Sequence, residues 1–219
     1  MQTNKYNNNK PKVILFDVDG VLIRLPNYFS QESDRQGYKG AEKSLTSFFK
    51  WSDKQQCIEG KASFEKKIVP YLEKFAWKGT AEEYFQKQFQ FEKRYLDQNI
   101  ISQIKQFRTR GIKCYLCTDN SKLRAEFLLE EMDFKNIFDD YFISCFIGYR
   151  KCHNEFWSYL INKLEKELSG VKSDEIAFFD DTQNNVDVAL KFGINATLFE
   201  DMVQFEKDLL LLKILNKKS

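Results

Sequence analysis

The segment of the sequence that most restricts the possible folds is Val13–Val21, which reads Val-Ile-Leu-Phe-Asp-Val-Asp-Gly-Val. Its first four residues are all apolar, so they predict a short strand buried on both faces, as in a parallel sheet. Asp17 and Asp19 follow the strand, and Gly20 permits a sharp turn. Two carboxylates this close repel each other unless a proton or a cation lies between them. Ligands bind open α/β sheets at this edge, although a capping aspartate and an Asp-Gly turn also fit these residues.

The rest of the chain alternates strand and helix patterns, apart from one helical block. Further buried strands are predicted at residues 112–117, 141–144, 176–179 and 196–199. Strands that alternate with helices pair in parallel through right-handed crossovers, which predicts an α/β fold with a doubly wound, Rossmann-like sheet. Residues 27–97 show helical patterns only, so we expect an all-helical cap inserted into a core of residues 13–26 and 98–219. Residues 1–12 are polar and are expected to be a disordered lead-in.

Composition restricts the class of function. Lys and Arg number 34 against 32 Asp and Glu, a net charge of +2 that does not favour a nucleic-acid-binding surface. The five cysteines lack the spacing of a disulfide scaffold, which indicates reduced thiols and a cytoplasmic location. No apolar run resembles a signal peptide or is long enough to cross a membrane, so no membrane partner is expected. Nothing in the sequence indicates an oligomeric state.

Polar side chains follow three of the predicted strands, and a lysine lies in a loop before a helix. We expect these side chains at one edge of the sheet: Asp17, Asp19, Thr118, Lys151, Asp180 and Asp181. Carboxylates are ligands for a hard cation, whereas a hydroxyl and an ammonium hold phosphate oxygens, so the set predicts phosphoryl transfer. A carboxylate can attack phosphorus to form an acyl phosphate that water then opens. Mg²⁺ would offset the repulsion between that carboxylate and the phosphate.

Four motifs occur in a characteristic order: Asp17-Val-Asp-Gly-Val21, Leu116-Cys-Thr118, Gly148-Tyr-Arg-Lys151 and Phe179-Asp-Asp-Thr-Gln-Asn-Asn-Val186. Together they resemble the motifs of the haloacid dehalogenase-like (HAD) hydrolase superfamily. The resemblance extends over most of the chain from Val13 to Phe199, and the helical block occupies the position of that family's type-1 cap. The family pattern usually has proline after the lysine, where this chain has Cys152.

The resemblance implies a role for each matching residue. Asp17 would be the nucleophile that becomes an aspartyl-phosphate, and Asp19 would protonate the leaving oxygen and then activate water. Thr118 and Lys151 would bind the phosphoryl group with help from the backbone N–H of Asp119. Thr118 could instead cap the following helix, and Lys151 could be a surface lysine.

The resemblance also implies a magnesium site. Asp17, the backbone carbonyl of Asp19, and Asp181 would hold Mg²⁺, with Asp180 nearby or sharing the task. Asp180 could equally be a helix cap.

The function predicted from these residues is Mg²⁺-dependent hydrolysis of a small phosphorylated metabolite. Asp19 favours a phosphatase over a dehalogenase, because the dehalogenase branch of the family lacks a carboxylate at that position. A phosphomutase similar to β-phosphoglucomutase and a catalytically silent binding protein remain alternatives. Five cap residues are candidates for contact with the leaving group: Tyr28, Lys39, Trp51, Lys54 and Trp77.

Overall fold

The computed structural model of the chain describes residues 9–50 and 52–215. The core is one parallel sheet with strand order β3-β2-β1-β4-β5. Its strands are β1 (Val13–Phe16), β2 (Lys113–Thr118), β3 (Asp140–Ile143), β4 (Ile176–Asp180) and β5 (Asn195–Leu198). The predicted α/β fold with a parallel sheet is therefore confirmed, and the later strand boundaries differ from the prediction by one residue or so.

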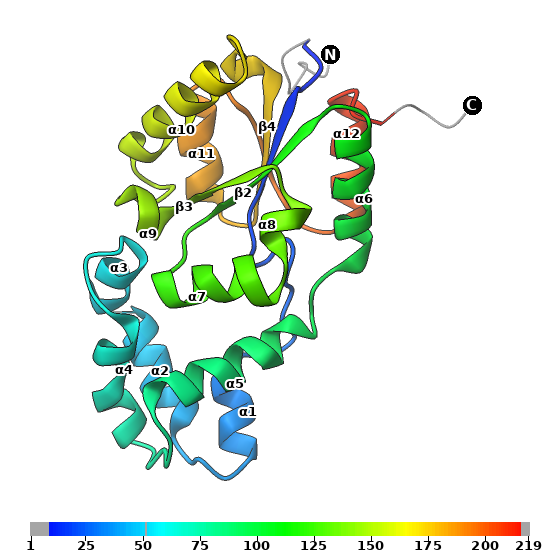
Figure 1. Cartoon of the computed structure of the whole chain (residues 1–219). Helices are drawn as coiled ribbons and strands as arrows, with labels where there is room; N and C mark the ends of the chain where they lie inside the picture. Colours follow the sequence, from blue (N-terminus) through cyan, green and yellow to red (C-terminus); the bar gives the residue numbers. More distant parts are fainter. Residues whose placement is uncertain (1–8, 51, 216–219) are drawn as a thin grey trace.

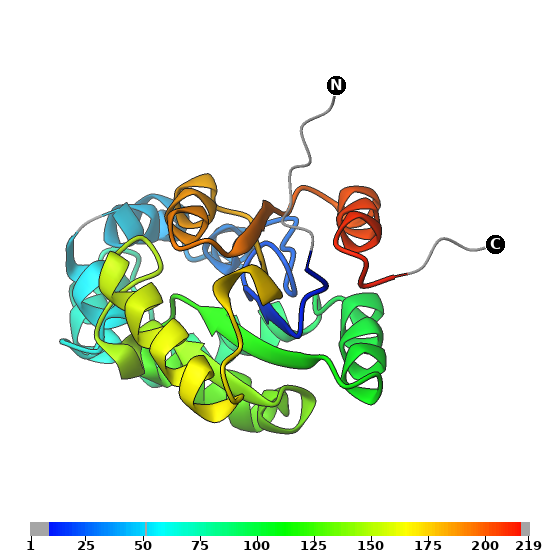
Figure 2. The ribbon, with the colours of Figure 1, turned by 90° about the horizontal axis from the view of Figure 1, so that it is seen from above.

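Helices cover both faces of the sheet, as the continuous apolar strands require (Figure 2). One face carries α6 (Gln98–Thr109) and α12 (Met202–Leu211), and the other carries α10 (Asn154–Glu167) and α11 (Gln183–Lys191). Ile14 and Phe16 of β1 pack on the first face, and Val13 and Leu15 pack on the second. All four side chains are fully buried, so β1 is the central strand of two cores.

Short elements complete the core. Between β2 and β3 lie α7 (Lys122–Glu126), the π-helical turn η1 (Phe127–Glu131) and α8 (Phe134–Ile137). After β3 come α9 (Ser144–Ile147) and, before β4, the 3₁₀ turn η2 (Ser173–Glu175). The α7–η1 segment lies at the end of the sheet that faces the cap (Figure 1).

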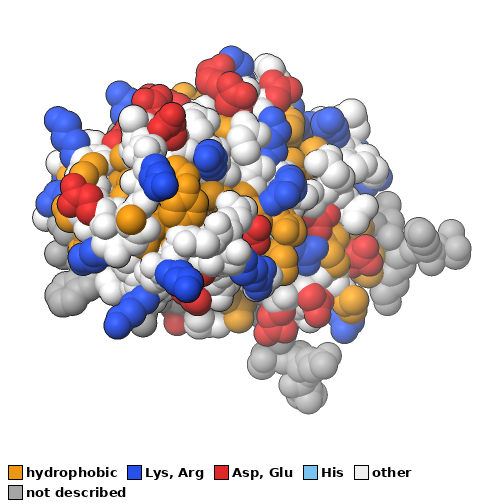
Figure 3. Space-filling model, turned by 90° about the horizontal axis from the view of Figure 1, so that it is seen from below, with side chains coloured by type: hydrophobic (Ala, Val, Ile, Leu, Met, Phe, Trp, Pro, Cys, Tyr) orange, Lys and Arg blue, Asp and Glu red, His pale blue; other side chains and the backbone are white. Residues whose placement is uncertain are grey.

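The inserted segment is all helical in the part that the structure describes. It comprises α1 (Phe29–Arg35), α2 (Ala41–Lys50), α3 (Ser52–Ile58), α4 (Phe64–Glu73) and α5 (Ala81–Lys93). Thr80 caps the start of α5, because its hydroxyl accepts the Glu83 N–H while the Glu83 carboxylate accepts the Thr80 N–H. The five helices lie beyond the carboxyl ends of the strands (Figure 1). On the face seen in Figure 3, basic side chains are interspersed with acidic and apolar ones.

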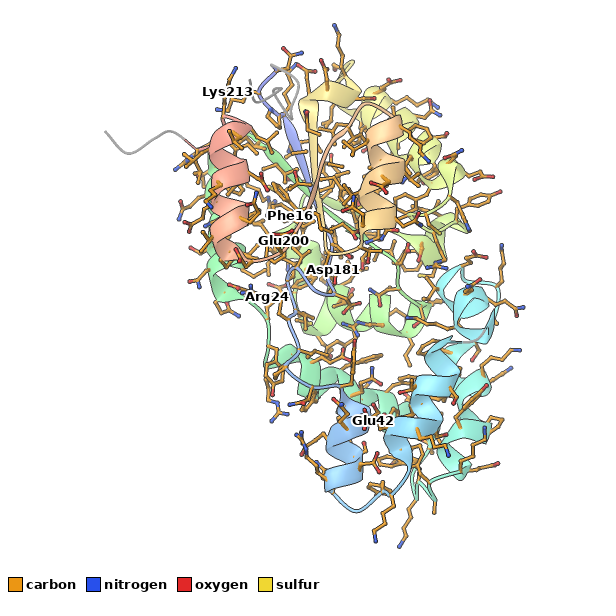
Figure 4. The ribbon with its side chains drawn as sticks, turned by 180° about the vertical axis from the view of Figure 1, so that it is seen from behind. Phe16, Arg24, Glu42, Asp181, Glu200 and Lys213 are labelled. Atoms are coloured by element: carbon orange, nitrogen blue, oxygen red, sulfur yellow. The ribbon has the colours of Figure 1, made fainter. Side chains whose placement is uncertain are left out.

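The two connections between core and cap lie side by side. Ile23 and Leu96 form an isolated antiparallel bridge. The N–H of Asp97 donates to the carbonyl of Leu22 at 2.8 Å, and the side chains of Arg24 and Asp97 form a salt bridge. The chain therefore leaves the core and returns to it at nearly the same point, where Figure 4 labels Arg24.

The predicted lead-in is described only from Asn9 onward, since residues 1–8 lie outside the described part. Lys12 already pairs with the core: its N–H donates to Glu175 at 2.8 Å and its carbonyl accepts from Lys113 at 2.9 Å. Across residues 9–50 and 52–215, no helix has the length and apolar character needed to cross a membrane.

Candidate active site

The loop after β1 carries the two aspartates to the end of the sheet that faces the cap. The N–H of Asp17 donates to the carbonyl of Phe179 at 3.0 Å, which continues the pairing of β1 with β4. Gly20 has φ +79°, and a Cβ at this position would lie 1.9 Å from Oδ2 of Asp181. Glycine is therefore required for the loop to lie against Asp181, which Figure 4 shows near the end of β1. The strand order reverses between β1 and β4, and ligands usually bind at this position in such sheets.

Lys151 lies at the centre of the site. Its Nζ is 2.8 Å from Oδ1 of Asp17, 2.6 Å from Oδ2 of Asp180 and 3.3 Å from the carbonyl of Cys117. The residue is only 1% exposed, and Trp157 anchors its backbone by donating Nε1–H to the Lys151 carbonyl. Burial opposes the charged ammonium, but the two carboxylates hold the pKa of Lys151 well above its usual range. The alternative of a surface lysine is wrong.

Asp180 is fully buried and organises its neighbours. Its Oδ1 accepts the N–H of Thr182 at 2.8 Å and the side-chain amide of Asn185 at 3.1 Å, while Oδ2 accepts Lys151. The carboxylate thus orders the start of α11 and also positions Lys151. A helix-ordering role and a role in the site are both present in the same side chain.

Asp17, Asp180 and Asp181 form an acidic cluster that could hold a metal ion. One carboxylate oxygen from each residue lies within 4.8 Å of the others. Burial raises the pKa of Asp17 and of Asp181, and the nearby Asp180 carboxylate raises both further, although Lys151 opposes the shift. A cation bound among these oxygens would relieve this repulsion, so the donor set and its electrostatics fit a hard metal such as Mg²⁺.

The end of β2 brings Thr118 and Asp119 to the same edge. Thr118 is buried, and its Oγ1 accepts the side-chain N–H of Asn120 at 2.8 Å. The residue that precedes α7 is Ser121, so Thr118 is not the helix cap. Oδ1 of Asp119 accepts the backbone N–H of Lys151 at 3.0 Å, which ties the loop of Lys151 to the end of β2.

Asp19 points away from the acidic cluster and toward the cap. Its side chain is 52% exposed, and Oδ1 accepts Nη2–H of Arg124 at 2.7 Å. Arg124 lies on α7 and is only 9% exposed. Its Nη1 lies 2.5 Å from Oε2 of Glu92, a buried residue of α5 in the cap. One arginine of the core therefore joins the predicted acid–base residue to the cap.

A cavity of about 90 Å³ lies between cap and core. Its lining includes Asp19, Asp119 and Arg124 from the core and Lys54, Gln88 and Phe89 from the cap. Of the predicted cap candidates, Lys54 lines this cavity, whereas Trp77 packs against Tyr84 within the cap and Tyr28 is exposed on the surface. Trp51 lies outside the described residues.

Residues 11–193 match the family model of haloacid dehalogenase-like hydrolases. The chain belongs to this family. The resemblance drawn from the four motifs is thus confirmed. No curated protein matches this HAD-like hydrolase.

Solved structures of HAD-family proteins share its fold at low sequence identity. A predicted HAD-like hydrolase from Porphyromonas gingivalis is 18% identical with a TM-score of 0.69, covering 92% of this chain and 98% of its own. A HAD-family enzyme from Bacteroides thetaiotaomicron, solved with magnesium and inorganic phosphate, is 15% identical with a TM-score of 0.67, covering 89% and 98%. A putative β-phosphoglucomutase from Thermotoga maritima is 17% identical with a TM-score of 0.53, covering 94% and 99%.

The motifs of this HAD-like hydrolase did not predict Arg124 and Glu92 as members of the site. Neither residue follows a strand. The sequence nevertheless contains a signal for their burial. Phe127 and Leu128 follow Arg124 by three and four residues, respectively, and Glu92 follows Phe89 by three residues. Both charges therefore occur on the apolar face of a helical pattern, where a charged side chain requires a buried partner.

Proposed function

We propose that this HAD-like hydrolase is a Mg²⁺-dependent phosphomonoester hydrolase that acts on a small phosphorylated metabolite through an aspartyl-phosphate at Asp17. The observation that carries the proposal is the position of Asp19, which lines the cavity between core and cap rather than joining the acidic cluster. A departing alkoxide needs a proton from such a group, whereas a departing halide needs none. A carboxylate at this position therefore favours an ester over a carbon–halogen bond.

The residues divide the reaction into two half-reactions. Asp17 attacks phosphorus, the bond to the leaving oxygen breaks, and that oxygen takes the proton of Asp19. Lys151 and Thr118 hold the phosphoryl oxygens. In the second half-reaction, Asp19 takes a proton from water, which attacks phosphorus and releases phosphate from Asp17. Arg124 stabilises the Asp19 carboxylate between the two proton transfers, and Glu92 compensates the charge of Arg124.

We assign the metal to the acidic cluster. Asp17 and Asp181 would hold Mg²⁺ with the backbone carbonyl of Asp19, while Asp180 would act mainly through Lys151 and Asn185, which already occupy its oxygens. Bound Mg²⁺ would offset the negative charge that the nucleophile and the phosphate bring together. The magnesium complexes of the Bacteroides enzyme support Mg²⁺ as the metal.

The phosphomutase alternative is less well supported. A mutase must let a sugar bisphosphate turn over inside a site that excludes water. The Asp19 side chain is 52% exposed, which favours transfer of the phosphoryl group to water over a cycle sealed from it.

Acetyl phosphate tests the nucleophile Asp17 independently of the proton donor Asp19, because its leaving group is acetate and needs no proton. With Mg²⁺, we expect Asp19→Asn to accept the phosphoryl group from acetyl phosphate and to retain it, since water activation is impaired. Intact-mass spectrometry should show one added phosphoryl group, and Asp17→Asn should show none. With glycerol 3-phosphate, Asp19→Asn should lose about 10²- to 10⁴-fold in rate.

Asp187→Asn is the matched control, because Asp187 is an exposed acid on α11 away from the cluster. It should behave as the wild type. Phosphate release that persists in Asp17→Asn would refute the proposal, and a wild type inert toward all small phosphate esters would favour the silent binding protein.

A further inference from the structure

We propose that the leaving group carries a hydroxyl on the carbon next to the ester carbon, and that this hydroxyl binds between Arg124 of the core and Gln88 of the cap. The inference rests on the proposed phosphatase function and names its substrate class, the phosphate monoesters of diols and polyols. It is based on two buried polar atoms that lack partners, and on the edge of the guanidinium to which one of them belongs.

Gln88 supplies a hydrogen-bond acceptor on the cap side of the cavity. Its Nε2–H donates to Oε1 of Glu92 at 2.8 Å, which fixes the orientation of the side-chain amide. The amide oxygen Oε1 is buried and has no hydrogen-bond partner among the described residues. A buried acceptor of this kind requires a donor. Because Gln88 lines the cavity, a group bound there can supply that donor.

Arg124 supplies a hydrogen-bond donor on the core side of the same cavity. Its guanidinium is held in place: Nη1 pairs with Glu92, Nη2 donates to Asp19, and Cζ lies 5.7 Å from the centre of the Phe89 ring. The residue is only 9% exposed, yet its buried Nε–H has no partner among the residues that the structure describes. Leaving a buried donor unpaired costs free energy, as does leaving an acceptor unpaired.

The group that binds between these two atoms must accept from Arg124 and donate to Gln88. A hydroxyl does both, because it carries one O–H donor and two acceptor lone pairs. A carboxylate only accepts, so it would leave Oε1 of Gln88 unpaired, and an ammonium only donates, so it would leave the Nε–H of Arg124 unpaired. The pair therefore selects a neutral hydroxyl. A water molecule has the same capacity, and the hydroxyl of the leaving group would displace it.

The guanidinium also indicates where on the leaving group the hydroxyl lies. Nε–H and one N–H of Nη2 lie on the same edge of this planar group, in a fork that suits two neighbouring oxygens. Nη2 of Arg124 donates to Oδ1 of Asp19 at 2.7 Å. In the proposed reaction the leaving oxygen lies against Asp19, so an oxygen bound at Nε lies close to the leaving oxygen. The two oxygens of a vicinal diol have this arrangement.

Binding to the Asp17→Asn protein tests the inference without hydrolysis. We would compare 2-hydroxyethyl phosphate with propyl phosphate by titration calorimetry in the presence of Mg²⁺. The two esters match in size and differ in a hydroxyl against a methyl group. Because the methyl group would leave both buried polar atoms unpaired, we expect propyl phosphate to bind about tenfold to a hundredfold more weakly.

Variants in the Asp17→Asn background assign the contacts. Gln88→Met removes the acceptor and keeps the length of the side chain, so it should reduce the preference for 2-hydroxyethyl phosphate to about threefold or less. Arg124→Lys, which retains the positive charge and lacks Nε–H, should reduce it likewise. Gln86→Met, which changes an exposed glutamine of α5, should keep the full preference.

Inorganic phosphate is the control ligand, because it has no leaving group. Gln88→Met should bind it as tightly as the Asp17→Asn parent does. Weaker binding of inorganic phosphate by Gln88→Met would mean that this variant acts through the fold, and would count against the inference.

Equal affinities for the two esters would mean that an ordered water alone fills the position, and would overturn the inference. Binding of neither ester, or a preference that survives Gln88→Met, would overturn it as well. Phosphate release by the wild type is measured separately. Selective binding of 2-hydroxyethyl phosphate without hydrolysis of either ester would refute only the phosphatase function, and hydrolysis of both esters at similar kcat/KM would refute only the hydroxyl subsite.

Discussion

The Glu92–Arg124 pair should contribute strongly to stability, because it is buried and joins the cap to the core. Arg124→Met would leave the Glu92 carboxylate buried without its cation. Removal of one partner from such a pair costs about 3–5 kcal/mol. Burial raises the pKa of Glu92 even with Arg124 present, so the carboxylate can relieve part of the cost by taking up a proton. We therefore expect a loss of about 3 kcal/mol at pH 8, near the lower limit of that range.

The loss should shrink as the pH falls. A carboxyl group whose pKa is raised in the folded state penalises folding above its unfolded pKa, and the penalty disappears once both states are protonated. Urea denaturation of Arg124→Met at pH 8 and at pH 5 measures this difference. The double variant Arg124→Met/Glu92→Leu should be more stable than Arg124→Met, because it removes the unpaired charge. A double variant less stable than Arg124→Met, or an effect that grows at low pH, would refute the reasoning.

Three further perturbations give distinct outcomes. Gly20→Ala should weaken Mg²⁺ affinity by about tenfold to a hundredfold, since its Cβ would meet the Asp181 carboxylate; an unchanged Mg²⁺ titration of the melting temperature would contradict this. Adding Mg²⁺ should increase the melting temperature of Lys151→Met by more than it increases that of the wild type, because Asp17 and Asp180 lose their cation in the variant. An equal or smaller increase would argue against this. Asp139→Asn should destabilise by about 1–3 kcal/mol at pH 7. Burial raises the pKa of Asp139, but the N–H of Cys114 and the nearby basic side chains lower it by more, so the charged carboxylate stabilises the folded state. The destabilisation should fade as the pH drops below about 4, and urea denaturation at pH 7 and pH 3.5 would show whether it does.

The sheet and its strand-end residues could be predicted because the signals are local. Val13–Phe16 is a run of apolar residues long enough for one strand, and the carboxyl ends of parallel strands meet at one edge. That rule alone brings Asp17, Thr118 and Asp180 together. The same rule does not place Lys151, because this residue lies in a loop before a helix. The structure shows why it is nevertheless buried: two carboxylates and a carbonyl surround its ammonium.

The contacts between cap and core could not be predicted in the same way. The contact between Glu92 and Arg124 depends on how the cap sits over the sheet, and no periodicity encodes that placement. Gln88 and Glu92 lie on one helix with the spacing of an ordinary side-chain pair. Only the packing of α5 against α7 shows that Gln88 lines the cavity and that Glu92 pairs with Arg124. The residue types in the sequence therefore predict the side chains at the strand ends. The side chains that line the cavity depend instead on how the cap and the core are arranged.

The paired connections at Ile23 and Leu96 make the cap an exchangeable module. The chain enters and leaves the cap through one short antiparallel bridge, while the strands of the sheet pair with one another. A different helical insert joined at Leu22 and Asp97 would replace Lys54, Gln88 and Glu92 together, and it would need a carboxylate of its own to pair with the buried Arg124 of the core. Grafting whole caps, rather than changing single residues, is thus the natural route to new substrates on this core.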